Sequence, residues 1–473
     1  MGRRRKLILA SLDWIRKKDP PFALGHASIV ANFMKRRVPV IHQAWSVNTS
    51  NFDPKKVVDF ALDHADSHSD FALGAFVWNE SYTQEIIKEL RKRKFPGRII
   101  LGGPQISYVK PSHASSIDSY YPQADIFIRG YAEQALADLM LSKVSSPMIP
   151  GVHYAGEPDL GFSASIELDE LPSPFLTGMI KPQKFIRWET QRGCPFRCSF
   201  CQHRESDVSM IRREFPVNRV FKEAEWITSN PIISDVAVLD PTFNSGPHYI
   251  SILEALTVGR YSGKLALQCR PEMVKTEFLD AVEKLNQTAN VVLEFGLQTI
   301  HKDEWVLIQR PTNLKKVTQV LEETRRRNIS VEVSLIFGLP QQTLASFKKS
   351  VVYCKQLGVP TIYAFPLMLL RGTPLYEQKE TLGLIESNEP VSTSIDRQQQ
   401  GISHVVSSPT FSYLDWRNMV KISEELQHYN TNNRGQWQPS STNNGSMFFS
   451  SNERVILKTT ERDCSIVSPG KHP

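Results

Sequence analysis

The chain has few cysteines and no long apolar run. Only six of its 473 residues are cysteine, which argues against the disulfide framework of a small secreted protein. Near the amino terminus, MGRRRK is followed by the apolar run LILA, which is too short for a signal peptide or a membrane span. These absences predict a protein of a reducing compartment, and we expect a cytoplasmic location and no membrane partner.

The chain also has little excess of positive over negative charge. The net charge of +7 is modest for this length and permits an anionic partner without requiring one. No RNA-binding appendage is recognisable, so a nucleic-acid partner is not expected. An apolar content of 41% in 473 residues indicates a globular protein with two or three domains.

Three of the six cysteines lie close together in the stretch ETQRGCPFRCSFCQHR, residues 189–204. The spacing of Cys194, Cys198 and Cys201 is C-x3-C-x2-C, and soft thiolates so close together suit an iron–sulfur cluster or zinc. Most cubane clusters use four cysteines, so three would leave one iron open for chemistry. The alternatives are a Cys3His zinc knuckle that includes His203, or a chance cluster.

Residues 1–145 alternate short apolar runs with amphipathic stretches, which predicts a doubly wound, Rossmann-like parallel sheet. Such sheets bind ligands at the carboxyl ends of their strands. The expected strands are Lys6–Leu12, Val38–Val47, Phe71–Trp78, Arg98–Leu101 and Asp125–Ile128. The proline-rich residues 146–184 read as a linker.

From residue 185 the strand–helix alternation resumes and predicts a second α/β domain over 185–380. Six repeats are fewer than the eight of a complete TIM barrel. The expected strands are Phe185–Gln191, Val236–Asp240, Lys264–Cys269, Asn290–Gln298, Ile329–Gly338 and Thr361–Leu369. We expect a helical extension over 381–430, with its helix at Ser412–Tyr429, and a flexible tail over 431–473.

The cysteine motif, with aromatic Phe200 before its third cysteine, resembles the signature of the radical S-adenosylmethionine (SAM) superfamily. The strand-end motifs VLDPTFN, LQCRPE, LEFGLQT, LIFGLPQQT and FPLMLLRGTPLYE extend the likeness over 185–380. The resemblance implies a partial (β/α)6 barrel and a 4Fe–4S cluster on Cys194, Cys198 and Cys201. In this family the open iron chelates SAM, and one electron splits SAM to give a 5′-deoxyadenosyl radical.

The same resemblance implies further contacts to SAM. Phe200 would offer its backbone to the adenine, with core packing as the alternative. Asp240 and Asn244 would receive the SAM ammonium, unless they only order a loop. Arg310 would pair with the SAM carboxylate, unless it is a solvated helix end.

Polar residues at three strand ends complete this predicted site. The resemblance places polar groups at Gln268, Gln298 and Ser334 around the ribose and the methionine. Glu294 lies four residues before Gln298 on the same strand, so both side chains share one face by the two-residue period of a strand.

Loops of the first domain resemble a cobalamin-binding-type domain. The stretches are Pro20–Gly25, Gly102-Gly103-Pro104-Gln105, Gly130–Glu133 and Leu171–Phe175, and Gly102 and Gly103 would let the ligand approach the backbone. The D-x-H-x-x-G motif that displaces the cobalamin base is absent, and His26 lacks an Asp two residues ahead of it. If cobalamin binds, we expect no histidine on cobalt. The alternative is a domain that keeps the shape and has lost the ligand.

Three functions remain open from the sequence. The first is a radical SAM enzyme that transfers a methyl group from cobalamin to an unactivated carbon. The second is a cobalamin-independent radical SAM oxidoreductase or mutase, and the third is a zinc-binding interaction protein. The first two imply a one-electron donor of the flavodoxin or ferredoxin type and an organic substrate that the sequence does not identify.

Overall fold

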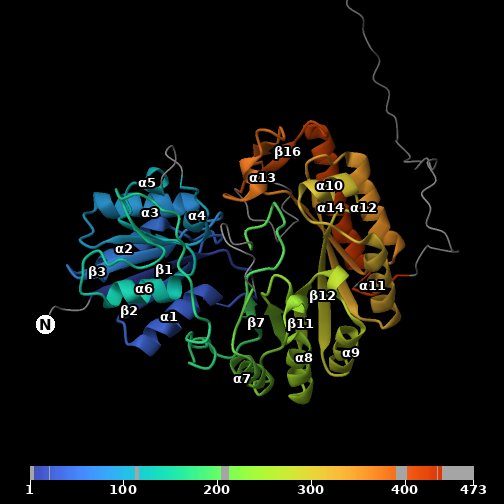
Figure 1. Cartoon of the computed structure of the whole chain (residues 1–473), viewed down its shortest axis with the longest axis horizontal. Helices are drawn as coiled ribbons and strands as arrows, with labels where there is room; N and C mark the ends of the chain where they lie inside the picture. Colours follow the sequence, from blue (N-terminus) through green and yellow to red (C-terminus); the bar gives the residue numbers. More distant parts are fainter. Residues whose placement is uncertain are drawn as a thin grey trace, which may run out of the picture.

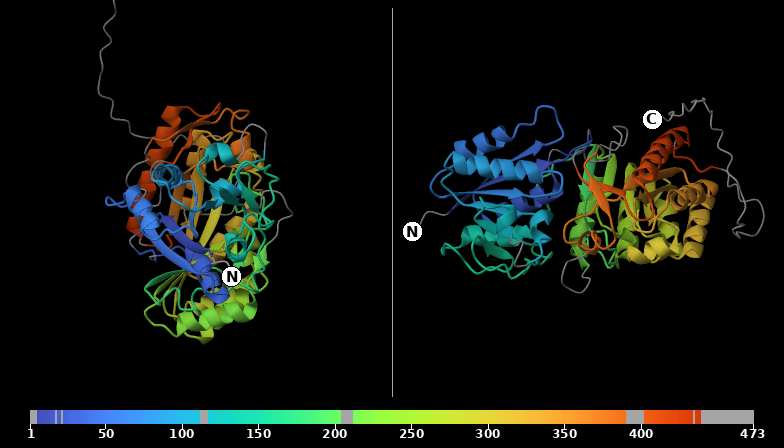
Figure 2. Two further views of the ribbon diagram at one scale, coloured as in Figure 1. Left: turned by 90° about the vertical axis from the view of Figure 1, so that its left-hand side faces the viewer. Right: turned by 90° about the horizontal axis from the view of Figure 1, so that it is seen from above.

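The structure is a computed structural model that describes residues 5–16, 18–20, 22–111, 117–203, 212–389, 402–433 and 435–438. Two six-stranded sheets form the molecule. Figure 1 shows the amino-terminal sheet with its helices in blue and cyan beside the larger unit in green to red, and Figure 2 shows the same arrangement from two other sides.

The first sheet has the strand order β2-β1-β3-β4-β5-β6. Its strands are β1 (Lys6–Asp13), β2 (Val40–Ser46), β3 (Ser69–Gly74), β4 (Ile99–Gly102), β5 (Ile126–Ile128) and β6 (Val152–Tyr154). All neighbours are parallel except β6, which pairs antiparallel with β5. The order reverses between β1 and β3, and doubly wound sheets bind their ligands at such a switch point.

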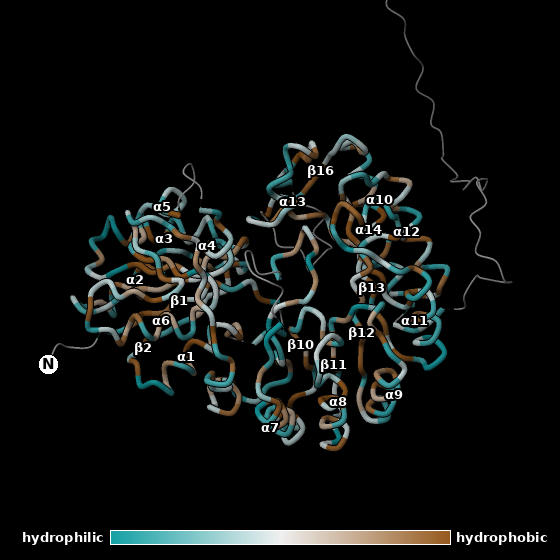
Figure 3. The backbone as a smooth tube through the Cα atoms, in the orientation of Figure 1, coloured by the Kyte–Doolittle hydropathy of each residue, from teal (hydrophilic) through white to brown (hydrophobic). Residues whose placement is uncertain are grey.

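Helices cover both faces of this sheet, because side chains alternate along each strand. Leu7 and Leu9 of β1 face α1 (Leu24–Arg36) and α6 (Ala132–Leu141). Ile8 and Leu12 face α2 (Pro54–Asp63) and α3 (Glu80–Lys92). Figure 3 shows the resulting hydrophobic strands between helices with hydrophilic outer sides. Two short helices, α4 (Pro104–Ser107) and α5 (Ile117–Tyr120), follow β4.

Residues 146–184, predicted as a linker, carry structure of their own. They supply β6, and Ala164 forms a parallel bridge with Gly130. Further along, Ile166, Leu168 and Phe175 are buried in the hydrophobic core of the second unit. A single edge strand and scattered apolar residues give no periodic pattern, which is why the sequence shows only its prolines here.

The second sheet is wholly parallel, with the order β14-β13-β12-β11-β10-β7. Its strands are β7 (Phe185–Trp188), β10 (Asp235–Val238), β11 (Lys264–Cys269), β12 (Asn290–Gln298), β13 (Ser330–Phe337) and β14 (Thr361–Pro366). In the described residues β7 and β14 pair with no common strand, so the barrel is open. The predicted fold class, a Rossmann-like sheet followed by a partial (β/α)6 barrel, is confirmed.

Helices and 3-10 turns connect the parallel strands. They are α7 (Val217–Thr228), η1 (Phe243–Ser245), α8 (Tyr249–Val258), η2 (Pro271–Met273), α9 (Thr276–Leu285), α10 (Lys302–Leu307), α11 (Leu314–Arg326) and α12 (Leu344–Gln356). Figure 1 shows α7, α8 and α9 side by side on the outer face of the sheet. No helix in the described part of the chain is long and apolar enough to cross a bilayer.

The carboxy-terminal segment contains α13 (Pro374–Glu377), the antiparallel pair β15 (Ile385–Ser387) and β16 (His404–Ser407), and α14 (Tyr413–Asn433). The predicted helix Ser412–Tyr429 corresponds to α14, which continues four residues further. Residues 431–433 therefore belong to a helix, and Trp437 donates from its indole to the carbonyl of Ile329 at 2.8 Å. The rest of the predicted tail, 439–473, lies outside the described residues.

Candidate active site

The cysteine triplet lies on the loop that follows β8 (Gln191–Arg192), which pairs with β9 (Arg213–Glu214). All three cysteines are half-buried. The backbone amide of Cys201 donates to the carbonyl of Cys198 at 3.2 Å, and the Cys194 sulfur lies 3.5 Å from the Thr242 hydroxyl. In the described residues no three His, Cys, Asp or Glu side chains are arranged to hold a metal ion, so the thiols share a loop without converging.

Buried backbone contacts anchor this loop to the barrel. The Ser199 amide donates to Ile308 at 2.9 Å, its hydroxyl donates to Leu307 at 3.1 Å, and its carbonyl accepts from Leu375 at 3.0 Å. Phe200 packs partly against the hydrophobic core. Core packing is therefore one role of Phe200, and its backbone contact to adenine stays a prediction.

Two buried arginines place positive charge beside the thiols. Burial raises the pKa of Cys198, and the nearby Arg310 and Arg270 oppose that rise. The Arg310 side chain is 6% exposed, donates to the Gly296 carbonyl and to the Thr312 hydroxyl, and lies 3.4 Å from Glu272. Arg310 is therefore not a solvated helix end. Three thiols on one loop beside two guanidinium groups fit an anionic cluster.

Arg270 was missed by the sequence analysis. Its guanidinium stacks 3.9 Å from the Phe196 ring, inside the cysteine loop, and pairs with Glu272 at 3.3 Å. It lies in the motif LQCRPE, directly after the last residue of β11, and this position at a strand end was the signal available. The charge of Arg192, two residues before Cys194, is paired with Glu133 and Glu189.

Asp240 and Asn244 form hydrogen bonds with backbone groups of the protein. Asp240 is fully buried and accepts from the Thr190 amide at 2.8 Å, from the Thr190 hydroxyl and from the Gln191 amide at 3.2 Å. Burial raises the pKa of Asp240 to about 7 against these hydrogen bonds. Asn244 bonds the backbone of Arg270 through both ends of its amide, at 2.9 and 3.0 Å. These contacts favour the loop-ordering alternative for both residues.

The polar residues of the strand ends share the inner face of the sheet. Along β12, Glu294, Gly296 and Gln298 are half-buried while Phe295 and Leu297 between them are buried. Gln268 pairs in register with Glu294, and Gly296 with Ser334. Gln298 has a φ of 70° beside a register shift, a conformation that costs energy and gathers at functional sites. The structure therefore brings Gln268, Glu294, Gln298 and Ser334 together, as the two-residue period predicts.

A cavity of about 650 Å³ lies between the first sheet and the second unit. Its walls include the ends of β1, β3, β4 and β5, the loop before α1, and residues 187, 189 and 192 of the second unit. Gly102 and Gly103 both line it. Gly103 has a φ of 91°, and a Cβ there would lie 2.7 Å from the Ala75 carbonyl, so close backbone packing explains this glycine. A Cβ on Gly102 would meet the protein only at 3.6 Å.

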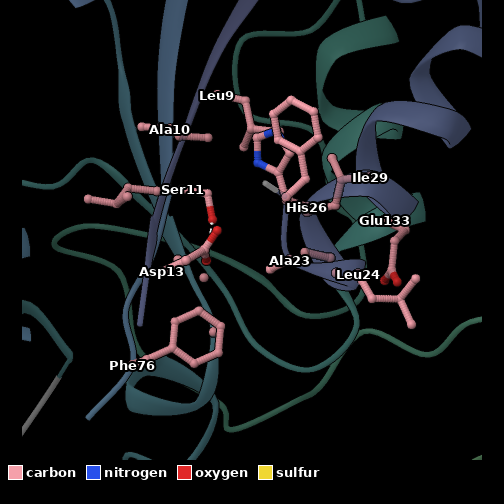
Figure 4. A pocket seen from close by; sticks show the side chains of 18 of the residues that line it. Leu9, Ala10, Ser11, Asp13, Ala23, Leu24, His26, Ile29, Phe76 and Glu133 are labelled. Carbon is pink, nitrogen blue, oxygen red and sulfur yellow. Dashed lines mark hydrogen bonds between the residues drawn. The ribbon is translucent and has the colours of Figure 1, made fainter. Parts of the chain in front are cut away.

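His26 lies in this cavity wall and is only 6% exposed (Figure 4). Its Nε2 lies 3.0 Å from Nδ1 of His42 on β2, and its ring stacks on Phe22. Burial, helped by His42, lowers the pKa of His26 to about 3, so the ring is neutral. A partner for His26 was absent nearby in sequence, and the fold supplies one from the neighbouring strand.

Charged residues join the cavity to the cysteine loop. Arg192, two residues before Cys194, lies 2.8 Å from Glu133 of α6 and 3.0 Å from Glu189. Further away, Tyr108 donates to the carbonyl of Gln202, the residue after Cys201. The Gln202 side chain donates in turn to the Arg371 carbonyl at 2.9 Å. The first unit thus contacts the cysteine loop close to both of its ends.

Comparisons with known proteins identify a family for part of the chain. The family model of the radical SAM superfamily matches residues 188–354. The chain is 26% identical over 344 residues to the cobalamin-dependent radical SAM methyltransferase TokK of Streptomyces tokunonensis, covering 66% of this chain and 49% of that protein. It is 25% identical over 334 residues to a 2-(S-pantetheinyl)-carbapenam-3-carboxylate methyltransferase of Streptantibioticus cattleyicolor, covering 63% and 47%. The chain thus spans about half the length of these relatives.

A solved structure extends the fold comparison to the amino-terminal unit. The radical SAM methyltransferase TsrM of Kitasatospora setae, solved with cobalamin and a [4Fe-4S] cluster bound, superposes with a TM-score of 0.65 at 16% identity, over 90% of this chain and 91% of that one. At this identity the likeness concerns the fold. Residues 188–354 therefore form a radical SAM domain, and the fold of the chain, its amino-terminal unit included, is like that of TsrM.

Proposed function

We propose that this protein is a cobalamin-dependent radical SAM enzyme that transfers a methyl group to an unactivated carbon. The observation that carries the proposal is the cavity at the switch point of the first sheet. One wall of this cavity is the segment Arg187–Arg192, which leads directly into the cysteine loop. A ligand in the cavity would therefore lie next to the chemistry at the barrel mouth. The relatives named for cobalamin and methyl transfer support the same function.

The cofactors would supply the reactive species. The cluster would give an electron to SAM, SAM would yield the deoxyadenosyl radical, and methylcobalamin would provide the methyl group. The chain's own residues would bind and orient them. Cys194, Cys198 and Cys201 would ligate the cluster. Arg270 and Arg310 would balance its charge, and Arg310 would also pair with the SAM carboxylate. Gln268, Glu294, Gln298 and Ser334 would hydrogen-bond the ribose and the methionine from the inner face of the sheet.

We assign Asp240 and Asn244 to positioning. Through Thr190 and Gln191, Asp240 fixes the backbone that enters the cysteine loop, and Asn244 fixes Arg270. Gly102 and Gly103 would form the floor under the cobalamin tail, and we expect no histidine on cobalt. The external partners are an organic substrate and a one-electron donor of the flavodoxin or ferredoxin type.

Anaerobic reconstitution of the full chain tests the proposal. We expect about four irons and four sulfides per chain, the stoichiometry of a cubane cluster. With added cobalamin, dithionite and SAM bearing a deuterated methyl group, we expect 5′-deoxyadenosine from SAM cleavage, and labelled methylcobalamin with S-adenosylhomocysteine from methyl transfer to the reduced cobalamin. Cys198→Ala should lose the cluster, while Cys269→Ala, at a buried site in the hydrophobic core, should keep it. Stoichiometric zinc without sulfide would contradict the proposal that the protein is a radical SAM enzyme. A cluster with no cobalamin binding would favour the cobalamin-independent oxidoreductase or mutase.

A further inference from the structure

Asp13 ends β1 at the switch point and lines the cavity between the two units. It is 8% exposed, and its Oδ1 accepts from the Ser11 hydroxyl at 2.8 Å. The backbone of Ala23 also favours the charged form of this carboxyl, whereas burial raises its pKa. The other oxygen, Oδ2, has no hydrogen-bond partner. Figure 4 shows Asp13 and Ser11 joined on the β1 side of the cavity, across from Leu24 and Glu133.

A buried carboxylate oxygen without a hydrogen-bond partner, such as Oδ2 of Asp13, destabilises the folded protein when no ligand is bound. Leaving a buried acceptor unsatisfied costs about 1–3 kcal/mol, and more for a charged group. Around Asp13 the walls of the cavity include the apolar side chains Ala10, Leu24 and Phe76, and the charge of Arg187 lowers the pKa of Asp13 without forming an ion pair with it. A donor on a bound ligand would remove the cost.

The other acidic residues of this wall are already paired. Asp19 lies 2.7 Å from Arg187 and 3.3 Å from Arg16. Glu133 and Glu189 both pair with Arg192. Oδ1 of Asp19 likewise has no hydrogen-bond partner but lies 3.3 Å from the Arg16 guanidinium, so among the described residues that line the cavity Asp13 is the carboxylate with an unpartnered oxygen and no ion pair. It faces a space that a flat, broad molecule would enter from the strand ends.

We propose that Asp13 is a specificity residue that accepts a hydrogen bond from a side-chain amide of the corrin ring and excludes corrinoids with a carboxylate at that position. This inference rests on the proposed function, because it takes cobalamin as the occupant of the cavity. An amide N–H donates to Oδ2, and a ligand carboxylate would instead bring two negative groups together. Placing like charges against each other is a common means of excluding a wrong ligand.

The test is equilibrium dialysis of the anaerobically prepared full chain against cyanocobalamin and each of its propionic monocarboxylic acids. In these acids one peripheral amide is replaced by a carboxylate. We expect the wild-type chain to bind at least one acid about tenfold or more weakly than cyanocobalamin, the scale of a lost charged hydrogen bond. In Asp13→Asn the affinity for cyanocobalamin should fall about threefold to tenfold, while the affinity for that acid should rise. Opposite movements of two ligands cannot come from partial misfolding.

Asp63→Asn is the matched control, because it makes the same change of charge on the exposed end of α2 in the same unit. It should keep the wild-type affinities. Equal affinity of the wild-type chain for all the corrinoids would overturn the role of Asp13 and leave the proposed function standing. The role of Asp13 would also be overturned if the Asp13→Asn variant kept the wild-type preference for cyanocobalamin over the acids. Failure of the wild-type chain to bind any corrinoid would overturn the cobalamin part of the proposed function together with this inference.

Discussion

Arg310 shows how one buried side chain serves both the fold and the candidate site. Its guanidinium bonds the Gly296 carbonyl of β12 and the Thr312 hydroxyl, and it lies near Glu272 and the Cys198 thiol. An arginine with its five donors can hold the bend of a strand and still present a charge to a ligand. The backbone contact explains why the residue is buried, and the charge explains what it can do there.

Replacing Arg310 by Ala should weaken SAM binding by about 1–3 kcal/mol, the scale of a lost hydrogen bond to a charged group. Isothermal titration of the reconstituted protein with SAM measures this. Arg326→Ala is the control, because Arg326 is exposed on α11 and pairs with Glu323 at the surface, where such pairs contribute little. Equal SAM affinity in both variants would remove Arg310 from the site.

The buried His26 leads us to predict that the folded protein is less stable at acidic pH. Burial lowers the pKa of His26 to about 3, below the value near 6.5 of an unfolded histidine. Below pH 6.5 the unfolded chain gains a proton that the folded chain does not, so stability falls with decreasing pH by up to about 1.4 kcal/mol per pH unit. Urea unfolding between pH 7.5 and 5 should show this slope, and His26→Asn should reduce it. A slope unchanged in the variant would mean that other groups cause it.

At the scale of elements, α14 protects an exposed sheet edge. β14 is the last strand of the second sheet, and unpaired edges invite pairing with another chain. Asn430 on α14 accepts from the Ile362 amide at 2.8 Å and donates to its carbonyl at 2.9 Å, as a neighbouring strand would. Ser423 adds a bond to the Ala364 carbonyl at 2.7 Å.

Asn430→Ala should therefore lower the free energy of unfolding by about 1–3 kcal/mol, because the amide and the carbonyl of buried Ile362 lose their partner. It should also raise the tendency to aggregate. Chemical denaturation and light scattering measure the two effects. Asn432→Ala, on the exposed side of the same helix, should change neither. If both variants match the wild-type chain, the edge is protected by packing alone.

Elements with a strong period could be predicted from the sequence, and those without one could not. The expected bounds of β11 and β12 agree with the structure, because each strand has a run of three buried residues that passes into alternation at its carboxyl end. β6 and the β15–β16 pair were not predicted, since each has only three or four residues and lies at an edge. In the site, the shared face of Glu294 and Gln298 followed from the strand period. The contacts of Asp240 with Thr190 and of His26 with His42 come from other elements of the fold, and no local pattern contains them.

At the scale of the whole molecule, the two units are joined where the proposed chemistry occurs. Arg371, in the loop after β14, lies 2.9 Å from Glu80 at the start of α3 and donates to the Gln105 carbonyl at 3.0 Å. Its ion pair is largely buried, and its guanidinium also lies 4.4 Å from the Tyr120 ring. Gln202 bonds the carbonyl of the same arginine, so this contact reaches the cysteine loop.

Arg371→Ala should loosen both the contact between the units and the cysteine loop, because Glu80 and the Gln105 carbonyl lose their shared partner. Removing one member of a fully buried ion pair lowers the free energy of unfolding by about 3–5 kcal/mol, which is the upper limit for this pair. Hydrogen exchange should therefore rise in residues 104–108 and in 193–203 together. Lys379→Ala is the control, because Lys379 pairs with Glu386 at 3.0 Å within the carboxy-terminal segment. Faster exchange in 104–108 alone would show that the two units meet at this arginine without transmitting its loss to the loop of Cys201.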